Sequence, residues 1–148
     1  MRTTIQPALQ LVFILDKTID RLLVEKLDVS LSQFKILMAL KHSPNASQRT
    51  IAKFWDMTEA SVSRQANILL SKKLIQKVKN PTSKREYILR KTRAGKAQIR
   101  RAINLIDSKL ENLFQNIGRE ERTRLAVSLN HMLSVIRKEA NIQSNGKN

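Results

Sequence analysis

Three short helical segments follow one another between residues 30 and 72 of the 148-residue chain. Ser30, Ser47 and Thr58 are residue types that favour the N-cap of a helix, and apolar residues spaced three or four apart follow each of them. The cluster His42-Ser43-Pro44-Asn45 ends the first segment, and Asp56-Met57-Thr58 separates the second from the third. The pattern predicts a helix after Ser30, a short helix after Ser47 and another from Thr58 to about Lys72.

A pair of short strands is predicted directly after these helices. Residues 74–79 and 87–89 fit two strands, and the polar segment 80–85 between them contains Pro81 and no apolar residue. A short helix, a tight turn, a second helix and a hairpin form the arrangement of a winged helix-turn-helix.

Longer helices are predicted on both sides of this lobe. Apolar residues in residues 5–27 follow helical spacing over a wide arc, which indicates a helix buried on two sides. After Thr92, apolar residues at 99, 103, 106, 110, 113 and 117 alternate steps of four and three, the seam of a helix that packs on another helix. A last helix is predicted from the apolar residues Leu125, Leu129, Met132 and Ile136, which follow the same steps. The expected fold class is therefore mainly α with a small β-hairpin wing.

The positive charge of the chain is concentrated in its middle. Lys and Arg number 28 against 12 acids, a net charge of +16. Residues 49–101 carry 15 basic and 3 acidic side chains, a net charge of +12, whereas the segments before and after carry +2 each. A solvated charged face would spread its charge more evenly, so this concentration favours a polyanionic partner, and above all nucleic acid.

Several function classes are excluded by composition. The chain has no Cys, and its two His residues lie far apart, so we expect no thiol chemistry and no metal site. The longest apolar run is Leu11–Leu15, too short for a membrane span, and we expect a cytoplasmic protein. Nothing resembles a nucleophile elbow or a phosphate-cradling loop, so we expect no enzyme and no cofactor.

At the helix-turn-helix and the hairpin, the sequence resembles the MarR (multiple antibiotic resistance regulator) family of bacterial transcription factors. The resemblance covers about residues 5–138. Ile51–Arg64 resembles the family's Leu-Ala pair, turn and Val-Ser/Thr-Arg without a gap, and Leu74-Ile75 matches the end of its Gly-Leu-Ile. Arg85 stands at the wing arginine, and Thr92 and Gly95 stand in the Leu-Thr-x-x-Gly that opens the next helix.

The resemblance implies a homodimer that binds a pseudo-palindromic operator, most often as a repressor. It implies one MarR-type domain over residues 1–148, with the DNA-binding lobe at 30–96, a helical dimerisation region at 1–29 and 97–138, and a frayed tail at 139–148. Many family members release DNA when a small anionic or phenolic effector binds. The resemblance places that pocket near Phe13, Phe34 and Met38, although residues at this helical spacing more often belong to a plain core.

The sequence departs from the family pattern at three informative positions. Lys73 stands where the family has a Gly in the left-handed conformation, so Lys73 either is strained there or ends the helix differently. Asp56 replaces a turn Gly, and Asp tolerates that conformation better than most residues. Ser83 replaces the wing aspartate that pairs with the arginine, which favours a more mobile wing.

The segment after Thr58 is the predicted recognition helix. Its outward arc holds Ala60, Ser61, Arg64, Gln65 and Ile68, with Ser63 and Asn67 beside it as backbone contacts. The small residues let the helix enter the major groove. Arg64 has the donors for guanine O6 and N7, and Gln65 has the donor and acceptor for adenine N7 and N6.

The wing offers a second contact with DNA. Thr82, Ser83, Lys84 and Arg85 lie at the predicted hairpin tip, where basic side chains are suited to the neighbouring minor groove or to phosphates.

We therefore expect a transcriptional regulator whose partners are double-stranded DNA and a second copy of itself. Three alternatives stay open: a low-specificity DNA-coating protein with the same fold, a protein-binding adaptor and a membrane-surface protein. The charge profile disfavours the adaptor. The basic segment has its own apolar core stripe, which disfavours the membrane surface.

Overall fold

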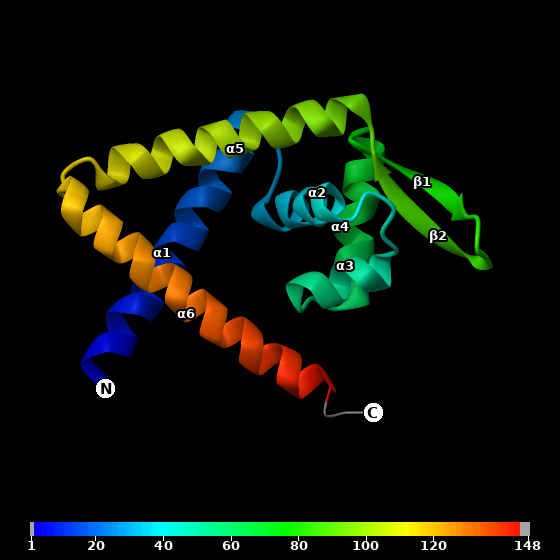
Figure 1. Cartoon of the computed structure of the whole chain (residues 1–148). Coiled ribbons are helices and arrows are strands. Elements are labelled where there is room, and N and C mark those ends of the chain that lie inside the picture. Colours follow the sequence, from blue (N-terminus) through cyan, green and yellow to red (C-terminus); the bar gives the residue numbers. More distant parts are fainter. Residues whose placement is uncertain (1, 146–148) are drawn as a thin grey trace. The chain divides into compact units, whose positions relative to one another are not determined.

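The computed structural model describes the backbone of residues 2–145 and the side chains of residues 6–83 and 86–138. Its elements are α1 (Arg2–Leu27), α2 (Leu31–His42), α3 (Gln48–Trp55), α4 (Glu59–Ser71), β1 (Ile75–Asn80), β2 (Ser83–Lys91), α5 (Arg93–Phe114) and α6 (Arg119–Asn145) (Figure 1). This mainly helical order with one antiparallel hairpin confirms the predicted fold class. The chain divides into two compact units, Met1–Asp107 and Ser108–Asn148.

The predicted N-caps of α2, α3 and α4 are confirmed. The side-chain oxygens of Ser30, Ser47 and Thr58 each accept a hydrogen bond from the backbone N–H three residues further on, at 3.2, 3.1 and 3.1 Å. Each bond satisfies a backbone donor that has no partner within the helix. These local bonds fix where the three helices of the lobe begin.

Three helices end at a residue in the left-handed conformation. Asp28, Asp56 and Lys73 have φ angles of 53°, 51° and 56°. Asp is among the residue types that tolerate this region, as expected for Asp56. Lys73 has no such advantage. The backbone there nevertheless keeps the left-handed turn for which the resembled family uses Gly. Lys73 therefore bears the steric cost of this conformation, roughly 1–2 kcal/mol.

The hairpin turns more tightly than the sequence indicated. We expected a polar turn over 80–85, but β1 ends at Asn80 and β2 begins at Ser83. The Asn80 Oδ1 accepts from both the backbone N–H and the hydroxyl of Thr82, at 3.1 and 2.9 Å, which closes the turn locally. The register shifts between Lys79 and Asn80. Glu86 and Tyr87 of the return strand are exposed, so these positions need no apolar side chain for burial.

The hairpin is attached to the helix-turn-helix. The backbone N–H of Leu89 donates to the carbonyl oxygen of Ala46 at 2.9 Å, so the loop between α2 and α3 bridges to β2. In Figure 1 the hairpin extends from this attachment away from α2, α3 and α4. The wing is therefore anchored at its base within the first unit.

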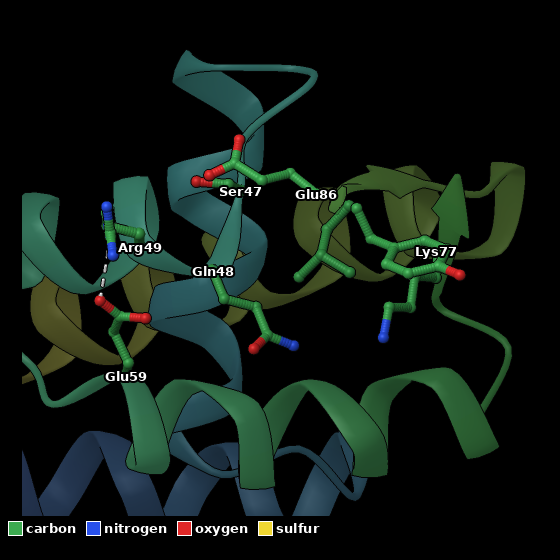
Figure 2. A pocket seen from close by; sticks show the side chains of 8 residues that line it. Ser47, Gln48, Arg49, Glu59, Lys77 and Glu86 are labelled. Atoms are coloured by element: carbon green, nitrogen blue, oxygen red, sulfur yellow. Dashed lines mark hydrogen bonds and ion pairs between the residues drawn. The ribbon is translucent and has the colours of Figure 1, made fainter. Parts of the chain in front are cut away.

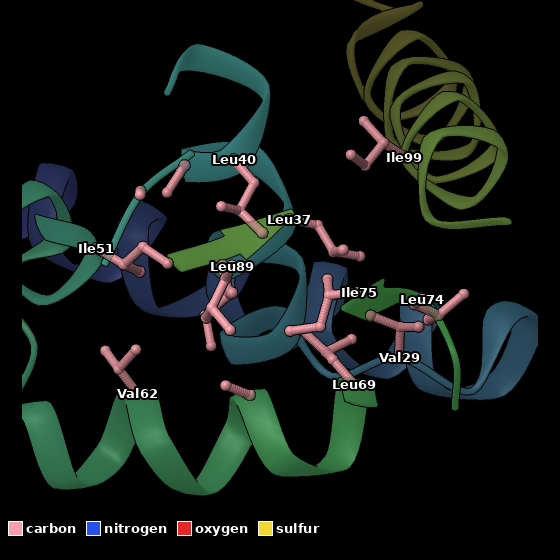
Figure 3. Packing of buried hydrophobic residues seen from close by; sticks show 14 of the residues in the cluster. Val29, Leu37, Leu40, Ile51, Val62, Leu69, Leu74, Ile75, Leu89 and Ile99 are labelled. Carbon is pink, nitrogen blue, oxygen red and sulfur yellow. The ribbon is translucent and has the colours of Figure 1, made fainter. Parts of the chain in front are cut away.

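A single apolar core holds the lobe together. It is formed by the buried side chains of Val29, Ile36, Leu37, Leu40, Ile51, Val62, Leu69, Leu74, Ile75, Leu89 and Ile99. In Figure 3 the side chains of α4 point toward those of α2, α3 and β2. Val62, Ala66 and Leu69 are buried as the sequence predicted, and Leu70 packs at the edge of the core. Burial of this stripe leaves the opposite face of α4 to solvent.

The start of α5 is locked onto the end of α4. The hydroxyl of Thr92 donates toward the carbonyl oxygens of Lys73 and Leu74, at 2.8 and 3.1 Å, and accepts from the Gly95 N–H at 3.0 Å. A Cβ on Gly95 would lie 2.0 Å from the Leu74 carbonyl oxygen. This close approach of two backbones requires glycine at position 95.

Both flanking helices carry exposed apolar residues. On α1 these are Leu9, Leu11, Val12, Phe13, Ile14 and Val24, and on α6 they are Leu125, Val127, Leu129, Met132, Leu133, Val135 and Ile136. The helix α6 runs to Asn145 and thus extends past residue 138, where a frayed tail was expected to begin. Residues 146–148 of that expected tail lie outside the described residues.

Candidate nucleic-acid interface

The outer face of α4 is centred on Ala60, Arg64, Asn67 and Ser71. These four residues are exposed and recur at steps of four, three and four, whereas Ser61, Ser63, Gln65 and Ile68 are half-buried on either side. The sequence placed Gln65 and Ile68 within the arc and Asn67 beside it. The structure moves Asn67 to the centre and the other two to the margin, because the packing of α4 against α2 and α3 sets the rotation of the helix.

Gln65 is already engaged by a residue of α2. The Gln33 Nε2 donates to the Gln65 Oε1 at 3.1 Å, and the Gln33 side chain is buried, with 6% of its surface exposed. The two residues are 32 positions apart in the chain. No local pattern in the sequence links them, and this contact was not predicted.

The tip of the wing is described in part. Thr82 takes part in the turn with Asn80, and Ser83 is half-buried at the start of β2. The side chains of Lys84 and Arg85 lie outside the described residues. The role of these four wing residues in binding DNA therefore stays a prediction.

A polar cleft of ≈ 270 Å³ lies between the helix-turn-helix and the wing. It is lined by Ser47, Gln48, Arg49, Glu59, Lys77, Glu86, Tyr87 and Leu89. Figure 2 shows the ion pair between Arg49 Nε and Glu59 Oε1, at 3.2 Å, on one side and Lys77 on the other. The Lys77 ammonium lies 4.5 Å from the centre of the Tyr87 ring, a cation–π contact. The cleft therefore mixes both signs of charge.

Most of the positive charge of residues 49–101 has no acidic partner. Among the described side chains, two ion pairs involve this segment, Arg49 with Glu59 and Lys72 with Asp28. Partial burial, together with the neighbouring charges of Lys96 and Lys41, lowers the pKa of Lys91. Crowding of like charges around Lys91 marks a region of positive potential that would favour an anion.

An aromatic cluster ties α3 to α2, and the sequence did not predict it. The ring of Phe54 stacks on His42 with centroids 5.9 Å apart and meets the edge of Trp55 at 5.1 Å. The indole N–H of Trp55 donates to the Lys35 carbonyl oxygen at 2.7 Å. This bond fixes the short helix α3 against α2 and so sets the geometry of the turn before α4.

The expected effector residues line neither of the two pockets described for this part of the chain. Phe13 is 66% exposed on α1, whereas Phe34 and Met38 on α2 pack against the core. Neither the cleft above nor a second pocket, which is lined by Arg49, Ala52, Lys53, Asp56, Met57 and Glu59, includes any of the three. An effector site at Phe13, Phe34 and Met38 stays a prediction.

Two kinds of feature are absent from the described part of the chain. No group of three or more His, Asp or Glu side chains there has the geometry to hold a metal ion. No helix within residues 2–145 is long and apolar enough to cross a membrane.

Part of the chain is similar to a known protein family. The model of the MarR family matches residues 29–87. These residues are similar to the DNA-binding lobe of MarR-family transcription regulators. The match spans the helix-turn-helix and most of the wing, so the family resemblance predicted from the sequence is confirmed. MarR-family members are transcription regulators and not enzymes. No curated protein sequence matches the chain.

Solved MarR structures share the fold beyond the lobe. The reduced form of MarR from E. coli is 24% identical, with a TM-score of 0.75 over 84% of this chain and 94% of that chain. Another MarR crystal structure is 19% identical, with a TM-score of 0.81 over 89% of this chain and 98% of that chain. A mutant E. coli MarR complexed with operator DNA is 25% identical, with a TM-score of 0.69 over 87% of this chain and 95% of that chain.

Proposed function

We propose that this MarR-family protein is a sequence-specific regulator that binds duplex DNA as a homodimer and represses by occupying a promoter. The observation that carries the proposal is the exposed face of α4, with Arg64 at its centre, in a segment of net charge +12. A MarR relative complexed with operator DNA supports the same use of the lobe.

In this proposal α4 enters the major groove. Ala60 and Ser61 are small enough at its first turn to let the backbone approach the bases. Arg64 is exposed and has the forked donors that fit guanine O6 and N7. Ser63, at the margin of the face, contacts the phosphate backbone, and Asn67 lies at the centre of the face that enters the groove. The wing residues 82–85 reach the adjacent minor groove or its phosphates.

The homodimer is proposed on the exposed apolar residues of α1 and α6. Side chains such as Leu9 and Phe13 on α1, and Met132 and Leu133 on α6, are open to water in the single chain. Apolar surface of this extent marks a protein interface in soluble proteins. Two lobes related by a two-fold axis would then meet successive major grooves of a pseudo-palindromic operator.

A small anionic or phenolic effector that releases the DNA remains part of the proposal. It would act by favouring a separation of the two lobes that no longer fits successive grooves. Its test is a screen of such compounds for loss of operator binding, once an operator is known.

A low-specificity DNA-coating protein is the second candidate, and the charge of the middle segment favours it. Fluorescence anisotropy on two duplexes across a salt series separates the two functions. One duplex is the intergenic DNA beside the gene, and the other is a scramble of equal length. We expect the native duplex to bind about a thousandfold more tightly. If about six phosphates are neutralised per dimer, the log–log salt slope is about −5.

Equal binding of both duplexes, with a steep salt slope, would establish the coating function instead. Binding of neither would favour a protein-binding adaptor, which a pull-down insensitive to nuclease would identify.

A further inference from the structure

We propose that Gln33 fixes the orientation of the Gln65 carboxamide, so that Gln65 offers DNA a hydrogen-bond donor and selects a guanine or thymine edge. Gln33 is thus a positioning residue for base readout, and Gln65 does not read adenine as the sequence pattern indicated. The proposal rests on the proposed function, because it assigns a specificity to the DNA-binding face of α4.

The orientation of Gln33 follows from a backbone donor. The Ser30 N–H meets the Gln33 side chain at 3.4 Å, and a backbone N–H donates only, so the atom that it meets is the oxygen Oε1. In return the Ser30 hydroxyl oxygen accepts from the Gln33 N–H at 3.2 Å, which completes a capping box at the start of α2. The amide nitrogen of Gln33 is therefore free to donate elsewhere.

The orientation of Gln65 follows from that of Gln33. The Gln33 Nε2 lies 3.1 Å from the Gln65 side chain, and this nitrogen donates only, so the Gln65 atom facing it is Oε1. Gln33 is 6% exposed, which keeps water from competing for the bond. A flip of either amide would set two donors or two acceptors against each other at a partly buried contact. The two contacts thus assign one consistent orientation to both amides.

The consequence is a change in the bases that Gln65 can recognise. Bidentate contact with adenine requires a donor for N7 and an acceptor for N6. Because the Gln65 Oε1 is held by Gln33, the carboxamide presents its NH₂ group. Guanine offers two acceptors, N7 and O6, and thymine offers O4, whereas adenine places its own N6 donor beside N7. Guanine and thymine are therefore the preferred partners of Gln65.

The substitution Gln33→Glu tests this directly. Glu suits the same capping-box position, and its carboxylate still accepts from Ser30, but it has no donor for Gln65. The Gln65 amide is then expected to turn its NH₂ toward Glu and its oxygen toward the DNA. The preference at one base pair per half-site should move from guanine or thymine to adenine or cytosine, by roughly fivefold to tenfold in relative affinity.

The measurement is competition, followed by fluorescence anisotropy, with a set of duplexes. In this set each base pair of the half-site is replaced in turn by each of the three other base pairs. Affinities are compared among duplexes for the same variant, so the general loss of affinity caused by the negative charge of Glu in Gln33→Glu cancels. Gln65→Ala should remove the preference at that pair, and Gln33→Glu should have no further effect on it in the Gln65→Ala background. Gln33→Leu, whose folding is checked by thermal melting, should relax the preference and admit adenine.

Two results would overturn the proposal. One is a wild-type preference for adenine at the pair that depends on Gln65, and the other is an unchanged preference in Gln33→Glu. If one of these two results is obtained while Arg64→Ala still alters base preference, the role of Gln33 fails and the proposed function stands. If the wild-type protein does not distinguish operator from scrambled DNA, the proposed function fails first, and this proposal fails with it.

Discussion

At the scale of single residues, Lys73 carries strain that a glycine would relieve. Its φ of 56° is left-handed, and its side chain is not part of the buried core. Lys73→Gly should therefore raise the free energy of unfolding by about 1 kcal/mol, measured by urea denaturation.

Its neighbour provides the matched control. Lys72 has a helical backbone and an ion pair with the Asp28 carboxylate at 2.9 Å. Lys72→Gly should destabilise the protein, since it removes that pair without relieving any strain. Equal effects of the two substitutions would contradict this account of Lys73.

Arg64 tests base readout at the same scale. Arg64→Ala should weaken operator binding by about 1–3 kcal/mol and relax preference at one base pair per half-site, as measured by anisotropy. Arg64→Lys keeps the charge but loses the planar fork, so it should also relax the preference. If Arg64→Lys binds like the wild type and Arg64→Ala weakens all duplexes equally, Arg64 is a phosphate contact.

At the scale of elements, an ion pair at the edge of the polar cleft joins α3 to the start of α4. Glu59 lies in the first turn of α4 and pairs with Arg49 at 3.2 Å, with both side chains largely exposed. An exposed pair of this kind contributes little to stability. Its larger effect is to neutralise Arg49 and to place a negative charge near phosphates.

Glu59→Gln should therefore strengthen DNA binding severalfold and make the salt slope steeper by about one, if the freed Arg49 gains a phosphate. The measurement is anisotropy on the scrambled duplex across a salt series. In an Arg49→Gln background the change in slope should disappear. If the salt slope of Glu59→Gln equals that of the wild-type protein, Arg49 lies away from the DNA.

At the scale of the whole molecule, the exposed apolar residues of α6 test the proposed dimer. Leu133 is 47% exposed in the single chain, so a charge there need not disturb the fold of the chain. Leu133→Glu should dissociate the dimer, measured by sedimentation equilibrium, while circular dichroism keeps its helical signal.

Ser134→Glu is the control for Leu133→Glu. It adds the same charge on the same helix, at a polar and exposed position next to Leu133. This variant should remain dimeric. A dimeric Leu133→Glu protein would exclude this position from the interface.

The elements of the lobe were predictable because their signals are local. A cap such as Ser47 acts on an N–H three residues away, and the apolar stripe Val62-Ala66-Leu69 repeats within one helix. The left-handed Asp56 was expected because the resembled family has a turn Gly at that position and Asp tolerates the conformation. The hairpin was predicted with a turn that is too long, since a polar strand without a buried face lacks the alternation that marks a strand.

What the sequence pattern missed lies between residues far apart in the chain. How one helix packs on another decides several features of the lobe. These are the rotation of α4, the Gln33–Gln65 hydrogen bond, the Arg49–Glu59 ion pair and the hydrogen bond from Trp55 to the Lys35 carbonyl oxygen. Helix periodicity defines a face to within about one residue, but packing decides which residue lies at its centre. Local chemistry thus predicted the elements, and the charge of the middle segment indicated a polyanionic partner. Tertiary packing decided which polar atoms are already paired and which remain to meet a base, because a hydrogen bond is set by distance and direction in space.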